Sequence, residues 1–421
     1  MSIQHHQRSE STRNFNRTRP GVVGLLAALG LLTGCGERSY SDLEEPASPG
    51  GGEPEESRQG LVVHEWGTFT SVQSSLGETL EGLHHEEETL PAFVYGRDIR
   101  SPIAKAMESL PEGVTQKMET PVIYFHTDKE IDVQVEVGFP QGVISEWYPQ
   151  AATFRPEVGG LTRVGEGHMR WDAHLTPTSV SMPEVPEEDV WAPSRRVDAA
   201  SVVVGQEGER FIFYRGLGRF EMPLRVTSDD LQVRVENLSD ERVPAVFLLH
   251  VHEGGGAVVA LGALEPRRDI VMSPSPKEID LDAYVADASD QIAAALIESG
   301  LFEDEAIAMV DTWSRSYFRT PGLRLLYVVP RSWTDALLPL SISPAPDAVV
   351  RTLVGRVEIL TPDRERAVVD QVRLAVEGGN FDMEALGRFA EPKLRRAAQL
   401  AQSDAERALI ETLIQQAEGM P

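Results

Sequence analysis

From residue 61 to about residue 272, apolar and polar residues tend to alternate along the chain. The segment IDVQVEVGF (131–139) has an apolar residue at every odd position and mainly polar residues between them. A period of two predicts a strand with one buried face, as in an antiparallel sheet. Further strands are expected at 121–127, 168–175, 210–216, 231–237 and 244–252. Short strands separated by Gly and Pro indicate a β-sandwich or a related all-β unit, interrupted by one helix near 101–109.

The period changes after about residue 277. Two helices and then two strands are expected, at 281–299, 303–318, 323–330 and 352–360. In the second helix, apolar residues recur at helical spacing from Ala306 to Tyr317 and form one stripe. The last stretch, 363–418, is expected to be helical. Pro392 suits a first helical turn, and Ser403 to Glu406 has the pattern of a capping box.

These patterns predict an α+β protein with a β-rich, sandwich-like N-terminal domain, a smaller α/β segment and a helical C-terminal tail. The expected organisation is a leader (1–34), an acidic tether (35–60), a β-rich domain (61–275), an α/β segment packed on it (276–362) and a helical tail (363–421). A chain of 421 residues is long enough for more than one domain. No repeat of fixed period is present, so a solenoid or propeller is not expected.

The net charge of −27 narrows the choice of partners. A strongly acidic body repels nucleic acid and anionic lipid, so neither is expected to bind it. Divalent cations or basic ligands suit such a surface better. The composition, 41% hydrophobic and 25% charged, is otherwise that of a soluble globular protein.

The only cysteine, Cys35, directly follows the leader. A basic stretch (8–19) precedes an apolar run of 12 residues, GVVGLLAALGLL (21–32), and LTGC follows. The run is too short to span a bilayer and suits an export signal. LTGC resembles the lipobox of bacterial lipoproteins, which implies cleavage before Cys35 and acylation of its thiol. Gly36 after the cysteine resembles the outer-membrane sorting pattern of enteric lipoproteins.

Acylation of Cys35 implies a protein held in the cell envelope by fatty chains, facing the periplasm or the exterior. Each buried methylene contributes about 0.8 kcal/mol to such an anchor. The segment 36–60, rich in Gly, Pro, Ser and Glu, is expected to be a flexible tether. Its reach is roughly 25–30 Å. A lipidated cysteine also excludes thiol catalysis and an intrachain disulfide.

A cluster of imidazoles and carboxylates at LHHEEETLP (83–91) offers ligands for zinc, iron or manganese. Together with HEW at 64–66, it suggests a divalent-metal site formed by His64, Glu65, His85 and Glu86. The spacing matches no zinc motif, and the alternative is a solvated loop with one or two structural hydrogen bonds.

A second metal candidate is the pair His250 and His252, which project to one face of an expected strand. The pair is similar to the His-x-His of cupins, but the glycines that follow depart from that family's pattern. A half-buried edge pair is the simpler interpretation. His126, His168 and His174 occur singly within expected strands and are interpreted as structural, hydrogen-bonded residues.

Motifs for several enzyme classes are absent. The sequence has no Gly-x-Ser-x-Gly elbow, no phosphate-binding Gly-Lys-Ser/Thr loop and no Gly-x-Gly-x-x-Gly fingerprint. Aromatic residues beside charged ones suggest instead a groove for a glycan or a peptide. The groove candidates are Trp66, Trp147, Tyr148 and Trp333. The alternative is that these side chains pack in the core and cap turns.

Six segments between residues 61 and 360 resemble a group of uncharacterised exported bacterial proteins. They are VHEWGTFTSV (63–72), HHEEETLPAFV (84–94), KMETPVIYF (117–125), GFPQGVISEWYPQA (138–151), FIFYRGLG (211–218) and RLLYVVPRSWTDALLPL (324–340). The resemblance implies one evolutionary unit over 61–360 and no particular substrate.

The sequence therefore favours a lipid-anchored envelope protein with a binding role and no catalysis, its partner an envelope protein or a glycan. The first alternative is a metal-dependent hydrolase that uses the cluster around His64 and His85, with a bound water as nucleophile. The second is a structural or assembly factor whose helical tail docks a partner.

Overall fold

The computed structural model describes residues 60–85, 89–97, 112–156, 164–229, 232–273, 279–314 and 316–418. The fold is α+β and rich in strands, with 27% helix, 39% strand and a helical C-terminal region, as the hydrophobic pattern predicts. The residues in these ranges belong to one compact unit. The leader, Cys35, the tether up to residue 59 and the helix expected near 101–109 lie outside the described residues.

A ten-stranded mixed sheet forms the centre of the fold. Its strands, in spatial order, are β16 (Ile279–Asp280), β14 (Gly255–Leu264), β13 (Val243–His252), β17 (Gly322–Val328), β19 (Ala348–Ile359), β1 (Val62–Gln73), β3 (Gln116–His126), β10 (Ile212–Gly218), β5 (Gly142–Tyr148) and β2 (Tyr95–Gly96). β1 and β19 pair in parallel along their whole length. Segments 61–275 and 276–362 therefore share one sheet, because β17 and β19 lie between β13 and β1.

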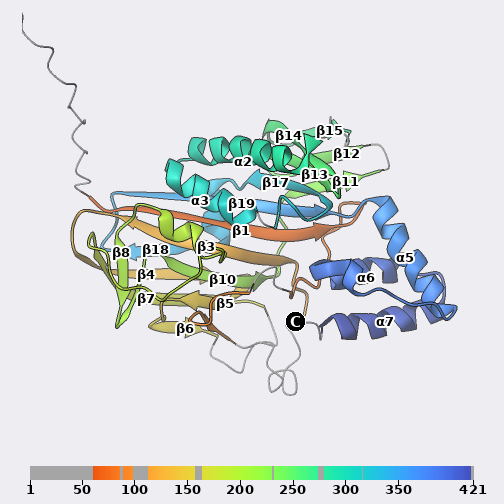
Figure 1. Ribbon diagram of the computed structural model, residues 1–421, viewed down its shortest axis with the longest axis horizontal. Helices are drawn as coiled ribbons and strands as arrows, with labels where there is room; N and C mark the ends of the chain where they lie inside the picture. The colour runs from red at the N-terminus through yellow and green to blue at the C-terminus, as the bar shows by residue number, and fades with distance from the viewer. Residues whose placement is uncertain are drawn as a thin grey trace, which may run out of the picture. The chain divides into compact units, whose positions relative to one another are not determined.

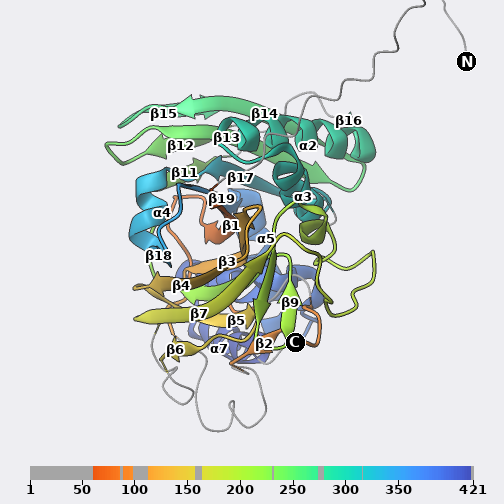
Figure 2. The ribbon, with the colours of Figure 1, turned by 90° about the vertical axis from the view of Figure 1, so that its left-hand side faces the viewer.

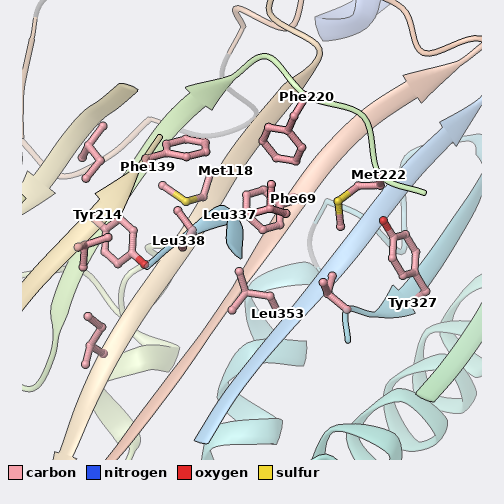
Figure 3. Packing of buried hydrophobic residues seen from close by; sticks show 14 of the residues in the cluster. Phe69, Met118, Phe139, Tyr214, Phe220, Met222, Tyr327, Leu337, Leu338 and Leu353 are labelled. Atoms are coloured by element: carbon pink, nitrogen blue, oxygen red, sulfur yellow. The ribbon is translucent and has the colours of Figure 1, made fainter. Parts of the chain in front are cut away.

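A second, six-stranded sheet packs on one face of the first. It consists of β18 (Leu340–Ser343), β4 (Ile131–Phe139), β7 (Gly167–Thr176), β8 (Ser201–Val204) and β9 (Glu207–Glu209), with β6 (Thr153–Arg155) paired to β7. Val133 and Val135 of β4 are buried against Phe69 and Met118 of the ten-stranded sheet in one hydrophobic core. Figure 3 shows part of this core, with Phe69, Met118 and Leu353 on neighbouring strands. The predicted alternation of β4 is confirmed.

Helices cover the other face of the ten-stranded sheet. Figures 1 and 2 place α2 (Leu281–Glu298) and α3 (Glu303–Trp313) on the side opposite β4 and β7. A short 3-10 helix, η1 (Pro193–Arg196), contacts α3. The predicted stripe of α3 is buried, although the helix ends at Trp313 and not at residue 318. This second core joins the helices to inward-facing side chains of the central strands, such as Trp66 and Val354.

Two smaller pieces complete the part before the tail. A three-stranded antiparallel sheet consists of β11 (Leu224–Ser228), β12 (Val233–Asn237) and β15 (Asp269–Met272). Helix α4 (Arg331–Leu337) follows β17, and its residue Leu337 packs into the core between the two large sheets.

The tail folds into α5 (Pro362–Val376), the 3-10 helix η2 (Glu384–Phe389), α6 (Ala390–Leu400) and α7 (Asp404–Glu418), with a hydrophobic core of their own. Pro392 lies in the first turn of α6, as predicted. Ser403 Oγ accepts a hydrogen bond from the Glu406 backbone N–H at 3.2 Å, which is one half of the predicted capping box. The Glu406 carboxylate bonds instead to the backbone N–H of Gln402, at 2.6 Å.

A buried carboxylate ties the tail to the sheet. Glu365 of α5 accepts hydrogen bonds from the Ser75 backbone N–H at 2.7 Å and from Arg396 Nε at 3.0 Å. Of the helices within the described ranges, none combines the length and apolar character that crossing a membrane requires.

Candidate metal centre

Two histidines meet on the helix-covered face of the central sheet. In the antiparallel pairing of β1 with β3, Val62 lies opposite His126 and His64 lies opposite Tyr124. His64 and His126 are therefore diagonal neighbours on one face, within reach of each other. Their ring centroids are 4.9 Å apart with the rings edge to face.

Helix α3 brings a carboxylate to both rings. Glu305, in its first turn, lies with Oε2 2.6 Å from His64 Nδ1 and with Oε1 2.9 Å from His126 Nε2. The Phe302 backbone N–H also donates to Oε2, at 2.8 Å. A Glu at this helix position commonly reaches back to the N-cap N–H, so the local fold of α3 itself orients the carboxylate.

The three side chains are enclosed. His64 is 2% exposed and both His126 and Glu305 are fully buried. Burial raises the pKa of Glu305, but hydrogen bonds with His126 and His64 outweigh this effect and lower the net pKa below its ordinary value. The carboxylate is therefore held in its charged form, in which it can bind a cation.

The neighbours of His126 constrain its protons. Its Nδ1 lies 3.1 Å from the backbone oxygen of Asp198, which can only accept a hydrogen bond, so Nδ1 carries a proton. The Nε2 lone pair of a neutral ring then faces the Glu305 carboxylate, which repels it. The contact is favourable if Nε2 is also protonated or if a cation lies between the nitrogen and the oxygen.

The three groups fit a divalent transition metal. His64, His126 and Glu305 each offer one ligand atom, and these atoms lie within 4.8 Å of one another. Zinc bonds of about 2.0–2.2 Å at tetrahedral angles separate ligand atoms by about 3.3 Å. The contacts of 2.6 and 2.9 Å would thus need to open by less than about 1 Å. A backbone carbonyl on the far nitrogen of His126 is the usual outer partner of a metal-binding imidazole.

Of the four residues proposed from the sequence as one site, only His64 belongs to this group. Glu65 points to the opposite face of the sheet, since neighbouring residues of a strand face opposite sides. There its carboxylate accepts hydrogen bonds from Tyr214 Oη and Arg351 Nε. Burial lowers the pKa of Arg351, but the charge of Glu65 outweighs burial and raises it overall. Glu65 is therefore one half of a buried ion pair in the sandwich core.

His85 lies toward the other end of β1. Its backbone oxygen accepts a hydrogen bond from Lys117 Nζ at 2.7 Å. Lys117 lies opposite Thr70 in the antiparallel pairing of β3 with β1. Thr70 is six residues along β1 from His64, a rise of about 20 Å. His64 and His85 therefore do not surround one ion. Glu86 lies outside the described residues.

The His250 and His252 pair lies on β13 with its ring centroids 6.1 Å apart and both residues half-buried. β13 pairs with β14 on one side and β17 on the other, so the pair is not at a sheet edge, contrary to the expectation from sequence. In the described ranges, no other His, Cys, Asp or Glu completes a metal-binding group with it. Its role in metal binding stays a prediction.

The aromatic residues proposed for a ligand groove are core residues. Trp66, Trp147 and Tyr148 are at most 5% exposed. Tyr95 stacks on Trp147 at 6.4 Å, and Trp333 is partly buried against the core between the two large sheets. These contacts support core packing, the alternative interpretation of the aromatic motifs.

Two residues of the centre were not singled out by the sequence. The sequence indicates a lone structural histidine at His126, and Glu305 is one of 66 acidic residues. The pairing of 61–73 with 116–126, which sets His126 beside His64, is not visible in the sequence of either strand. Nothing local to Glu305 distinguishes it from an ordinary acidic residue in a first helical turn.

Comparisons with known proteins do not identify the chain. No protein-family model matches it. No curated protein matches it significantly. Among solved structures, the yeast δ-COP-I μ-homology domain in complex with a WxWxV peptide aligns with a TM-score of 0.25 and 7% identity, covering 72% of this chain and 98% of that one. The same domain without peptide gives a TM-score of 0.24 and 6% identity, covering 72% and 97%. A likeness at this level supports no inference about fold or function.

Proposed function

We propose that this protein is a lipid-anchored component of the bacterial cell envelope whose folded body binds one divalent transition-metal ion, best fitted by zinc. His64, His126 and Glu305 are the proposed ligands. The observation that carries the proposal is the position of His126, with a carbonyl oxygen on one ring nitrogen and a shared carboxylate on the other.

A metal ion accounts for this arrangement better than protons alone. A buried imidazolium paired with a carboxylate keeps two charges away from water, at a desolvation cost of several kcal/mol per ion. A divalent ion replaces that proton with two or three coordinate bonds and leaves Nδ1–H of His126 on the carbonyl of Asp198. Two imidazoles and one carboxylate are also a known zinc-binding set, in which a water molecule fills the fourth position.

The enclosure of the ligands favours binding without catalysis. Catalytic zinc sites keep one position open to water or substrate. Here Glu305 and both histidines are at most 2% exposed, and the ring of Phe302 lies 4.5 Å from the His64 ring and 4.8 Å from the His126 ring. The proposed role of the ion is to hold helix α3 on the sheet.

The envelope location rests on the sequence of the leader. A basic stretch, a short apolar run and the only cysteine occur in the order of a lipoprotein signal. Attachment through acyl chains on Cys35 makes the membrane the proposed partner of the N-terminus, while the acidic body remains in the aqueous phase.

Metal analysis of the purified mature protein tests the proposal. The wild type is expected to carry one zinc ion per chain, or to acquire it on dialysis, and to give tetrahedral cobalt absorption bands after exchange. Glu305→Gln keeps the size of the side chain and removes its charge, and it is expected to abolish both signals. His174→Asn is the matched control, because His174 is a half-exposed histidine that pairs with Asp132 at 2.8 Å on the six-stranded sheet.

The proposal fails if the wild type holds no stoichiometric ion after dialysis against zinc, manganese, iron or nickel. It also fails if Glu305→Gln binds the ion as tightly as the wild type does.

A further inference from the structure

Phe302 packs against both imidazoles of the proposed metal centre and is itself partly exposed to solvent. The two imidazoles and Glu305 are at most 2% exposed, whereas Phe302 is 38% exposed. Its ring packs on both imidazoles, tilted against His64 and edge to face with His126. The ring thus contacts both imidazoles while the residue remains partly exposed to water.

From this geometry we infer that Phe302 is the gate through which the metal ion enters and leaves. The inference rests on the proposed metal binding and adds a route and a rate-controlling residue. An ion cannot reach the nitrogen and oxygen atoms of the site along the Phe302 side while the ring is in place. Rotation of the ring toward solvent uncovers both imidazoles at once.

The backbone at this point is suited to such a movement. Phe302 is the N-cap residue of α3, on the short connection that follows α2. Gly300 in this connection has φ of 106°, a left-handed conformation that glycine adopts without strain. The Phe302 backbone N–H donates a hydrogen bond to Glu305 Oε2 at 2.8 Å. Side-chain rotation at Phe302 leaves this hydrogen bond and all three ligands in place.

The gate has a kinetic consequence. Removing the ring lowers the barrier to both entry and exit, because it opens the path to the site. It removes no ligand of the ion. Exchange is therefore expected to accelerate in both directions, while the equilibrium affinity changes much less than the rates do. A side chain that only stabilised the fold would not produce this pattern.

The test is the rate at which a coloured chelator removes zinc from the full mature protein, with the binding rate measured in parallel. Phe302→Ala is expected to release zinc at least about tenfold faster, the factor that corresponds to about 1.4 kcal/mol of barrier. Phe302→Leu, which keeps most of the bulk, should remain within a few-fold of the wild type. Ile307→Ala is the matched control, since Ile307 is a 48% exposed apolar residue on the same helix.

The outcomes separate the two proposals. If the wild type binds zinc and Phe302→Ala releases it at the wild-type rate, the gate is wrong and the metal centre stands. If the wild type binds no ion, both are wrong. Phe302→Val provides a milder truncation, expected to give an intermediate rate, should the alanine variant fold poorly.

Discussion

His126 Nε2 lies 2.9 Å from Glu305 Oε1 although 179 residues separate them in the sequence. The contact joins the end of a central strand to the first turn of a helix that covers the sheet. The proposed ligand set is assembled from three distant segments, with His64 as the third, and exists only in the folded chain. Binding of an ion there is therefore coupled to folding.

Zinc is expected to stabilise the folded protein through this coupling. A ligand that binds only the native state adds about 2.7 kcal/mol at a free concentration of 100 times Kd. Thermal unfolding of the wild type should shift upward on adding zinc and downward on adding a chelator. Glu305→Gln should show neither shift, and His174→Asn should show both. Equal shifts in Glu305→Gln and the wild type would mean that zinc acts elsewhere.

Glu65 is expected to be important for stability and irrelevant to the metal. Glu65→Gln leaves Arg351 without its fully buried partner, and breaking a buried pair costs about 3–5 kcal/mol of unfolding free energy. Denaturant unfolding measures this loss, while the metal content should remain that of the wild type. Arg351 also pairs with the half-exposed Asp335 at 2.8 Å, so the loss should lie toward the lower end of this range. The double variant Glu65→Gln, Arg351→Met should recover part of it, because the buried guanidinium is removed as well. Loss of the ion in Glu65→Gln would place Glu65 in the metal centre after all.

The elements of this fold were predictable where the pattern is local. β4 follows from strict alternation over nine residues, and α3 follows from an apolar stripe at helical spacing. The pairing of strands cannot be predicted from such local patterns. β1 and β19 are parallel neighbours although Val62 lies opposite Ala348, and no pattern within either strand specifies that partner.

The candidate metal centre likewise depends on long-range contacts more than on local sequence pattern. The sequence suggests a site at His64 because Glu65 is next to it. On a strand, however, the side chains of adjacent residues point to opposite faces. His126 and Glu305 are brought to His64 by sheet pairing and helix packing, which the sequence does not display. The tail gives a further example: Arg388 Nη1 donates to Glu119 at 2.7 Å, a contact between η2 and β3 that composition does not suggest.

The proposed lipid anchor gives a prediction independent of the fold. Cys35→Ala removes the only thiol that can be acylated, so the protein should move from the membrane fraction to the soluble fraction. Metabolic labelling with palmitate should mark the wild type and not the variant. The metal content of the released variant should equal that of the wild type, because the anchor and the folded body are chemically independent. Unchanged fractionation of Cys35→Ala would contradict the lipoprotein assignment.

Acid should destabilise the protein partly through Glu358. Burial raises the pKa of this β19 carboxyl, but the charges of Arg324 and Arg356 outweigh it and lower the pKa from 4.5 to about 2. Between these two values the unfolded chain binds the proton and the folded chain does not, so stability increases with pH in this window. The full contribution is present above about pH 4.5 and is lost as the pH falls toward about 2.

The difference between a pKa of 4.5 and one of about 2 corresponds to about 3 kcal/mol. The unfolding free energy of Glu358→Gln should therefore change less steeply between these pH values than that of the wild type, by about this amount over the window. Glu411→Gln on the exposed face of α7 is the control and should keep the wild-type slope. Urea unfolding at closely spaced pH values measures both slopes. Parallel curves for Glu358→Gln and the wild type would show that the two arginines do not hold this carboxylate ionised in the folded state.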